Sequence, residues 1–119
     1  MKVILLDYCG TLDLLKDPVK FVNDLKADGW VTALFSGSSY GDIRREFPGL
    51  LEAFDQKFSK CTLGRDVLEE LFYSGIVPTE IVVLDDDAGV GKGMVASFNH
   101  YKPNGIARYV PAEDWQTLL

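Results

Sequence analysis

Four apolar residues near the amino terminus, Val3 to Leu6, run without a break and stop at a single carboxylate, Asp7. An apolar run of this length is typical of a strand that is buried on both faces, as in a parallel sheet. Similar runs occupy Trp30 to Phe35 and Ile81 to Leu84, and each of them also ends in polar residues. Since open α/β sheets bind ligands at the carboxyl ends of their strands, the pattern predicts polar side chains gathered at one edge of such a sheet.

Helical signals separate these strands. Asp17 can cap a helix, Pro18 suits its first position, and Gly29 follows its end. Ser39 and Asp42 resemble a capping box that opens a short second helix. The remaining expected elements are a weak strand at Lys57–Ser59, a helix capped by Thr62 with the face Val67, Leu68, Leu71 and Phe72, a helix marked by Met94, Val95 and Phe98, a last strand at Ile106–Val110 and a terminal helical turn within Glu113–Leu119. Strands that alternate with helices indicate right-handed βαβ units, and so an α/β fold with helices on both faces of the sheet.

Length and composition restrict the class of protein. A chain of 119 residues makes one domain, residues 1–119, and its apolar runs are far too short to span a membrane. No secretory signal pattern opens the chain, so we expect a soluble, cytoplasmic protein. The net charge of −6 argues against binding to nucleic acid or to an anionic membrane. Cys9 and Cys61 are too few for a disulfide framework or a zinc site, and we expect both to be small buried residues.

Three adjacent carboxylates, Asp85 to Asp87, follow the Ile81–Leu84 run. Such residues repel one another by about 1 kcal/mol per close pair in water, so either solvent or a cation must surround them. If this strand lies beside the first one, their carboxyl ends are roughly 4.8 Å apart, and Asp7 converges with Asp85 or Asp86. Carboxylate oxygens in that arrangement suit Mg²⁺, which keeps several waters and accepts further ligands from a substrate phosphate.

Ser36 ends the second strand as Asp7 ends the first, and Gly37 and Ser38 follow it at the expected start of a helix. A hydroxyl group with free backbone N–H groups beside it can hold a phosphate. Capping of the helix by Ser38 or Ser39 explains the serines equally well without any ligand.

Taken together, these motifs resemble the haloacid dehalogenase (HAD) superfamily: Asp-x-x-Gly-Thr-Leu from Asp7, Ser36-Gly37, a lysine before the Val67–Phe72 helix, and Asp85-Asp86. The resemblance extends from Val3 to Val110 with the motifs in the family's order. It implies a three-layer Rossmannoid sheet of about five mainly parallel strands in the order 5-4-1-2-3. It also implies Mg²⁺-dependent hydrolysis or transfer of phosphate esters through an aspartyl-phosphate.

The resemblance assigns roles to individual residues. Asp7 is the expected nucleophile and a metal ligand, and the backbone carbonyl of Cys9 is a second ligand. Asp86, supported by Asp85, completes the metal site. The residues expected to hold the phosphoryl group are Ser36, Gly37 and a lysine, for which Lys60 best fits the spacing and Lys57 and Arg65 are alternatives.

One position departs from the family pattern. Phosphatases of the family carry a general acid–base aspartate two residues after the nucleophile, and here that position is Cys9. A thiol has an ordinary pKa of about 8.5 and is a poor substitute. Loss of general acid–base help costs roughly 10²–10⁴ in rate, so we expect slow hydrolysis, a long-lived phospho-Asp7 or no turnover. Asp13 on the same loop is a candidate replacement acid.

The chain also has no room for a cap domain in either place where the family inserts one. A capless member acts on a large accessible substrate or closes its site by homo-oligomerisation, so the expected partner is a phosphoprotein or a phosphorylated small molecule. A catalytically inactive HAD-like binding or structural module is the main alternative. A receiver-like phosphoacceptor domain is excluded, because its acidic pair would follow the first strand and its phosphoacceptor the third.

Other candidate motifs fail on spacing. Cys9 and Cys61 lack the arginine six residues on that a cysteine phosphatase needs. The segment from Gly89 to Gly93 matches neither a Walker A loop nor a dinucleotide fingerprint, and we expect a flexible turn there. His100 has no partner at metal-ligand spacing and is expected at the surface or at a helix end.

Overall fold

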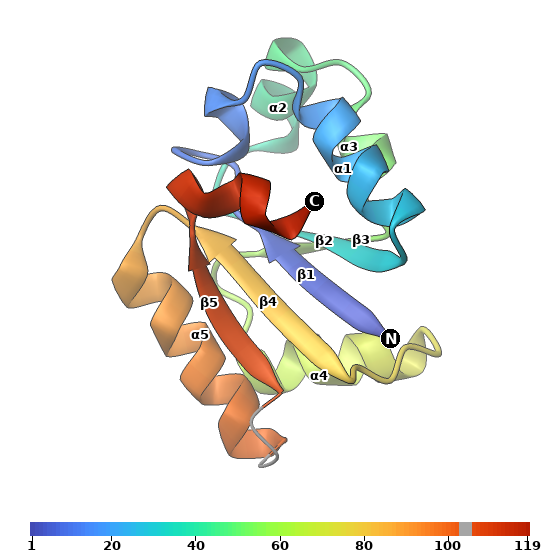
Figure 1. Ribbon diagram of the computed structural model, residues 1–119, viewed down its shortest axis with the longest axis vertical. Coiled ribbons are helices and arrows are strands. Elements are labelled where there is room, and N and C mark those ends of the chain that lie inside the picture. Colours follow the sequence, from blue (N-terminus) through green and yellow to red (C-terminus); the bar gives the residue numbers. More distant parts are fainter. Residues whose placement is uncertain (103–105) are drawn as a thin grey trace.

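A computed structural model describes residues 1–102 and 106–119 of the chain (Figure 1). Its centre is a parallel sheet of five strands: β1 (Lys2–Leu6), β2 (Trp30–Ser36), β3 (Gln56–Ser59), β4 (Glu80–Asp85) and β5 (Ala107–Pro111). The strands lie in the order β3-β2-β1-β4-β5, which reads 5-4-1-2-3 from the β5 edge. The α/β class and the parallel sheet are therefore confirmed.

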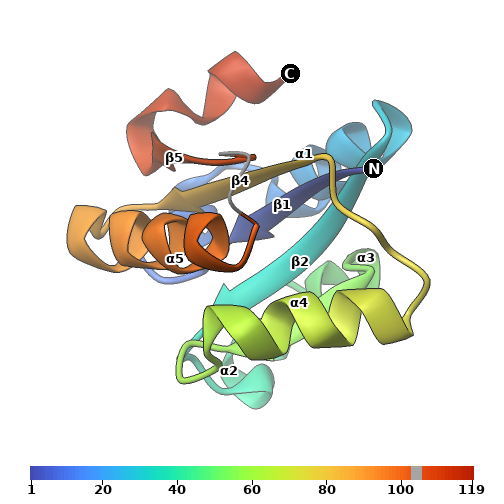
Figure 2. The same ribbon diagram turned by 90° about the horizontal axis from the view of Figure 1, so that it is seen from below.

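Helices cover both faces of this sheet. The helical elements are η1 (Leu12–Leu14), α1 (Pro18–Ala27), α2 (Tyr40–Glu46), α3 (Leu50–Ala53), α4 (Gly64–Tyr73), α5 (Ala88–Tyr101) and η2 (Ala112–Leu118). Figure 2 shows α4 and α5 on one side of the strands and α1 with the carboxyl-terminal η2 on the other. In the described part of the chain, no helix combines the length and the apolar character that crossing a membrane requires.

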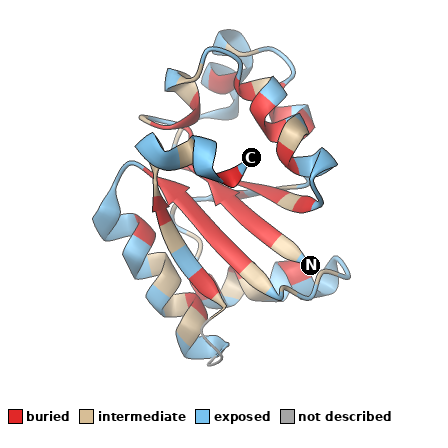
Figure 3. Cartoon of the chain, in the orientation of Figure 1, coloured by how far each residue is buried: buried red, intermediate tan, exposed pale blue. Residues whose placement is uncertain are grey.

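The central position of β1 in the sheet explains why its sequence is apolar without alternation. Ile4 and Leu6 belong to the core under α1, α2 and α3, whereas Val3 and Leu5 belong to the core under α4 and α5. All four side chains are 0% exposed, and Figure 3 shows β1 and β4 buried along most of their lengths. Burial on both faces places β1 and its carboxyl end in the middle of the molecule.

Several local expectations are confirmed. The side chain of Asp17 accepts a hydrogen bond from the Lys20 N–H at the start of α1, and Pro18 occupies the first helical position. Ser39 caps α2 by accepting from the Asp42 N–H. Each of these helices therefore begins where its capping residue predicts.

The predicted start of α4 is wrong. Thr62 donates its N–H to the Ser59 carbonyl and lies in the preceding turn, so Leu63 is the residue before the helix and contributes no side-chain cap. The predicted apolar face is also too wide. Val67 and Leu71 are buried, but Phe72 is 67% exposed.

The segment from Gly89 to Gly93 is not the expected flexible turn, because it forms the first turns of α5. The Asp87 side chain accepts a hydrogen bond from the Val90 N–H and caps this helix. A Cβ atom on Gly91 would lie 2.4 Å from the Tyr109 ring, so the glycine allows α5 to pack closely on β5. Gly91 therefore serves packing in a helix rather than the conformation of a loop.

Candidate functional site at the carboxyl edge of the sheet

The strand register brings the predicted site residues to one edge of the sheet. Leu6 in β1 pairs with Leu34 in β2 and with Leu84 in β4. The next residue, Asp7, donates its N–H to the Leu84 carbonyl at 3.0 Å, which continues the ladder past the end of β1. Asp7 therefore leaves the sheet between the ends of β2 and β4.

Three carboxylates converge there. Asp7, Asp85 and Asp86 each offer an oxygen, and these oxygens all lie within 4.8 Å of one another. Asp7 is 3% exposed and Asp85 is 0% exposed, whereas Asp86 is exposed to solvent. The predicted convergence of Asp7 with the acidic residues after β4 is confirmed.

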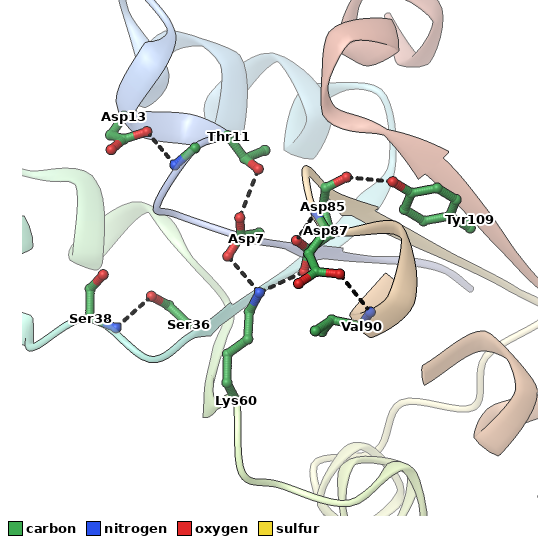
Figure 4. A network of polar contacts seen from close by, with 11 residues as sticks. Asp7, Thr11, Asp13, Ser36, Ser38, Lys60, Asp85, Asp87, Val90 and Tyr109 are labelled. Atoms are coloured by element: carbon green, nitrogen blue, oxygen red, sulfur yellow. Dashed lines mark hydrogen bonds and ion pairs between the residues drawn. The ribbon is translucent and has the colours of Figure 1, made fainter. Parts of the chain in front are cut away.

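Lys60 lies between two of these carboxylates (Figure 4). Its Nζ is 2.8 Å from Oδ1 of Asp7 and 2.7 Å from Oδ2 of Asp85. The Lys60 N–H donates to the Ser36 carbonyl at 3.1 Å and so anchors the loop after β3 beside β2. The side chains of the two alternative cations lie elsewhere: Lys57 is exposed on β3, and Arg65 contacts Asp66. Lys60 is therefore the cation that the fold brings to the acidic cluster.

Each carboxylate of the acidic triplet has a different position. Oδ1 of Asp85 accepts the Asp87 N–H at 2.9 Å, and the Asp85 carbonyl accepts the Tyr109 hydroxyl at 2.8 Å. Asp86 and Asp87 are both exposed to solvent, but the Asp87 side chain caps α5, whereas Asp86 faces the cluster. Only two of the three acidic residues after β4 thus belong to the cluster around Asp7.

Burial dominates the electrostatics of Asp7. Removal from water raises the pKa of its carboxyl group from 3.8 to about 6, with Lys60 and Thr11 opposing the shift and Asp85 adding to it. Burial lowers the pKa of Lys60, but its hydrogen bonds to Asp7 and Asp85 outweigh that effect and raise the pKa above its ordinary value. Three carboxylates facing one ammonium group leave an excess of negative charge, which a divalent cation could neutralise.

Thr11 and Tyr109 were not predicted as site residues. The Thr11 hydroxyl donates to Oδ2 of Asp7 at 2.8 Å, while Tyr109 holds the backbone of Asp85. Thr11 stands in the Asp-x-x-Gly-Thr-Leu motif, so its sequence position was a usable signal. No comparable signal marks Tyr109, because its contact depends on how β5 packs beside β4.

The expected phosphate-binding segment follows β2. Ser36 is 5% exposed, and its Oγ accepts the Ser38 N–H at 3.0 Å, which leaves the hydroxyl proton free for donation. Gly37 is exposed and lies beside the Lys60 side chain, with 4.0 Å between the Lys60 Cβ and the Cβ that an alanine would carry. Ser39 caps α2, so the alternative explanation by helix capping is confirmed for Ser39, whereas Ser36 contacts the turn before the helix.

The loop after β1, which we call the flap (residues 8–16), holds the position of the missing acid. Cys9 is exposed, as is Cys61, so the expectation that both are buried is wrong; both lie in loops beyond strand ends. Asp13 accepts the Gly10 N–H at 2.8 Å and thereby stabilises the turn of the flap. In Figure 4 its carboxylate points to that backbone rather than to Asp7.

Gly10 brings the flap against the acidic cluster. Its φ of 78° lies in the left-handed region, and a Cβ at this position would be 2.2 Å from Oδ2 of Asp86. Both the backbone conformation and the close approach therefore require glycine.

The fold and site define an α/β protein with a lysine-bridged acidic cluster at the carboxyl edge of a parallel sheet. Comparison of the chain with models of protein families, with curated proteins and with solved structures gave no match.

Proposed function

We propose that the chain is a capless HAD-like phosphohydrolase or phosphotransferase that acts through an aspartyl-phosphate on Asp7, with activity reduced by Cys9. The observation that carries the proposal is the position of Lys60 between Asp7 and Asp85, with Asp86 completing the cluster. A parallel sheet in the order β3-β2-β1-β4-β5 supports the Rossmannoid, HAD-like assignment. The stretch from Asp7 to α1 contains only the short η1 turn, which supports a capless arrangement.

The donor set fits Mg²⁺. Asp7, Asp85 and Asp86 supply hard oxygen ligands, and the exposed side of Asp86 leaves room for water and substrate oxygens. The backbone carbonyl of Cys9 is the fourth proposed ligand. Bound there, Mg²⁺ would neutralise charge on the phosphoryl oxygens and on the carboxylates.

The residues of the chain divide the remaining work. Thr11 and Lys60 hold the two oxygens of Asp7, and thereby orient the carboxylate for attack on phosphorus. The Lys60 ammonium and the Ser36 hydroxyl, with the Gly37 backbone, would hold the oxygens of the transferring phosphoryl group. The substrate would be a phosphorylated small molecule or a phosphoprotein.

Cys9 limits the reaction. The residue at this position should protonate the leaving oxygen and then activate the water that hydrolyses the aspartyl-phosphate. A thiol does both poorly at neutral pH, and the Asp13 carboxylate is engaged by the Gly10 N–H. We therefore expect slow turnover, because both the departure of the leaving oxygen and the hydrolysis of phospho-Asp7 lack general acid–base help.

The test is phosphate release from 4-nitrophenyl phosphate with Mg²⁺. Cys9→Asp should raise the rate by about 10²-fold or more, because it restores the acid and base. Adding Asp7→Asn to that variant should abolish the gain. Cys61→Asp is the matched control, since it places a carboxylate on the other exposed cysteine, and it should leave the rate unchanged.

One observation favours the alternative of a catalytically inactive HAD-like binding or structural module. The Lys60 ammonium already pairs with both buried carboxylates, so each of them has a cationic partner without any ligand. If Cys9→Asp neither binds Mg²⁺ in calorimetry nor releases phosphate, this alternative replaces the proposed enzyme.

A further inference from the structure

A cleft of about 230 Å³ lies between the flap and η2, next to the acidic cluster. Two of its wall residues belong to the cluster's immediate surroundings. Thr11 donates to Asp7, and Asp86 supplies one of the three converging carboxylates. The cleft and the acidic cluster therefore share Asp86 and adjoin at Thr11, which makes the cleft a neighbouring site for the organic part of a ligand whose phosphoryl group lies at Asp7.

The walls of the cleft are mainly apolar. They are formed by Leu14 and Leu15 of the flap and by Ala112 and Trp115 of η2. The Trp115 ring packs edge-to-face on Phe21 with 5.1 Å between the ring centroids, which holds one wall in place. A planar aromatic group suits such a wall, because aromatic rings attract one another beyond the effect of buried area.

The charged side chains that line the cleft, Asp86 and Glu113, are both acidic. An organic group with a carboxylate or a second phosphate would lie against these negative charges in a partly desolvated site. The cleft therefore favours a group that carries no further negative charge.

The presence of Cys9 in place of a general acid independently favours an aromatic leaving group. Without a general acid, the rate depends on how well the leaving oxygen carries its own negative charge. A phenol has a pKa of about 10, far below the value of roughly 16 for water and the similar values of simple alcohols. An aryl oxide can thus leave without protonation, whereas an alkoxide cannot leave readily.

We propose that the substrates are aryl phosphate monoesters whose organic part has no additional negative charge, and that the cleft between the flap and η2 binds the aryl ring. The inference rests on the proposed function of Asp7. In the first step an Asp7 oxygen forms a bond to phosphorus while the P–O(aryl) bond breaks, and the aryl oxide leaves with the electron pair. Water then attacks phosphorus and the bond between phosphorus and the Asp7 oxygen breaks, which restores the Asp7 carboxylate and releases inorganic phosphate; the proton that the water loses goes to solvent, from which the aryl oxide takes one up.

The test measures binding without turnover, by calorimetry on the wild-type protein with Mg²⁺. Benzylphosphonate should bind about tenfold or more tightly than methylphosphonate, because only the former fills the cleft. Benzylphosphonate with a carboxylate in the para position should lose most of that advantage. Equal affinities for the benzyl and methyl compounds would overturn the inference.

A pair of matched variants locates the binding surface. Leu14→Asp adds a negative charge at a side chain that is 76% exposed, so the fold should persist while the benzyl preference falls about tenfold. Val77→Asp is the control, because Val77 is 57% exposed and lies beside Met1 at the opposite end of the sheet. A benzyl preference that survives Leu14→Asp would contradict the proposed cleft.

Phosphate release separates this inference from the proposed function. The Cys9→Asp variant could hydrolyse phenyl phosphate and yet bind benzylphosphonate no more tightly than methylphosphonate. That result would support the proposed enzyme and reject the cleft as the aryl-binding site. Conversely, Leu14→Asp could weaken the preference for benzylphosphonate while the Cys9→Asp variant shows no hydrolysis. That result would support aryl ligands of the cleft and reject the catalytic function.

Discussion

Lys60 carries a single positive charge between two carboxylates that are 3% and 0% exposed. Buried carboxylates without a partner are costly, whereas the same groups in a hydrogen-bonded ion pair are tolerated. The lysine therefore has a structural role in the free protein as well as the proposed role toward phosphate. These two roles can be measured separately.

Replacement of Lys60 tests the structural role. Lys60→Met keeps most of the aliphatic side chain but leaves Asp7 and Asp85 uncompensated, so the free energy of unfolding at pH 7 should fall by about 2–3 kcal/mol. The loss should shrink toward pH 5, because the Asp7 carboxyl group, whose pKa is raised to about 6, takes up a proton there. Urea denaturation at both pH values gives the measurement.

Lys57→Met on β3 is the control for this change. Lys57 is exposed on the neighbouring strand, so its replacement should alter stability by less than about 0.5 kcal/mol. Equal effects of the two substitutions on the free energy of unfolding would mean that the Lys60 ion pairs do not contribute specifically to stability.

Sequence reasoning predicted the cluster residues because each follows a strand directly. Asp7 and Asp85 are located by the ends of apolar runs, and parallel pairing brings such ends together. Lys60 could only be ranked first among three cations, because the path of the loop after β3 is not visible in a local pattern. Thr11 could have been found from its place in the Asp-x-x-Gly-Thr-Leu motif, whereas the contact of Tyr109 depends on the pairing of β5 with β4, which is a tertiary feature.

At the scale of elements, the helix marked by Met94, Val95 and Phe98 is confirmed as part of α5, but the expectation for its first turns was wrong. Gly89, Gly91 and Gly93 lower the helix propensity of its first turns, so a loop was expected there. Capping by Asp87 and close packing on β5 outweigh that propensity. The same limit explains the start of α4, where a turn hydrogen bond from Thr62 to Ser59 replaces the expected cap.

Two alanine substitutions in α5 separate packing from propensity. Gly91→Ala should destabilise the protein by roughly 1–3 kcal/mol, because its Cβ would lie 2.4 Å from the Tyr109 ring. Gly93→Ala meets no atom within 4 Å and should stabilise the protein by up to about 1 kcal/mol. Thermal and urea denaturation of the two variants provide the comparison.

The Tyr109 hydroxyl also donates to the Asp85 carbonyl, so a displacement of the ring by Gly91→Ala should weaken Mg²⁺ binding, while Gly93→Ala should not. Stabilisation by both substitutions would show that the first turns of α5 do not pack as closely as described.

For the whole molecule, the acidic cluster predicts how stability changes with pH. The carboxyl group of Asp7 has a pKa of about 6 in the folded protein, against an ordinary value of 3.8. Between these values the folded state binds more protons than the unfolded state, so the contribution of Asp7 to stability falls as pH rises from about 4 to about 6. Above that range its ionised form opposes folding.

Asp7→Asn isolates this contribution. In the absence of divalent cations, the difference in unfolding free energy between the variant and the wild type should grow in favour of the variant between pH 4 and 6, and then level off. Mg²⁺ should reverse the difference at pH 7, because it binds the folded wild type and stabilises it by mass action. A difference independent of pH and of Mg²⁺ would contradict the described environment of Asp7.

The position of β1 has a consequence for how the polypeptide reaches its native state. This strand pairs with residues 30–34 on one side and with residues 80–84 on the other, so its second edge stays open until most of the chain has been synthesised. During that interval the apolar run Val3–Leu6 presents unpaired backbone groups, the kind of segment that aggregates or recruits chaperones. Nascent chains that end before β4 should therefore aggregate or bind a chaperone on the ribosome. Dissociation from the chaperone should coincide with the emergence of residues 80–85 from the ribosome.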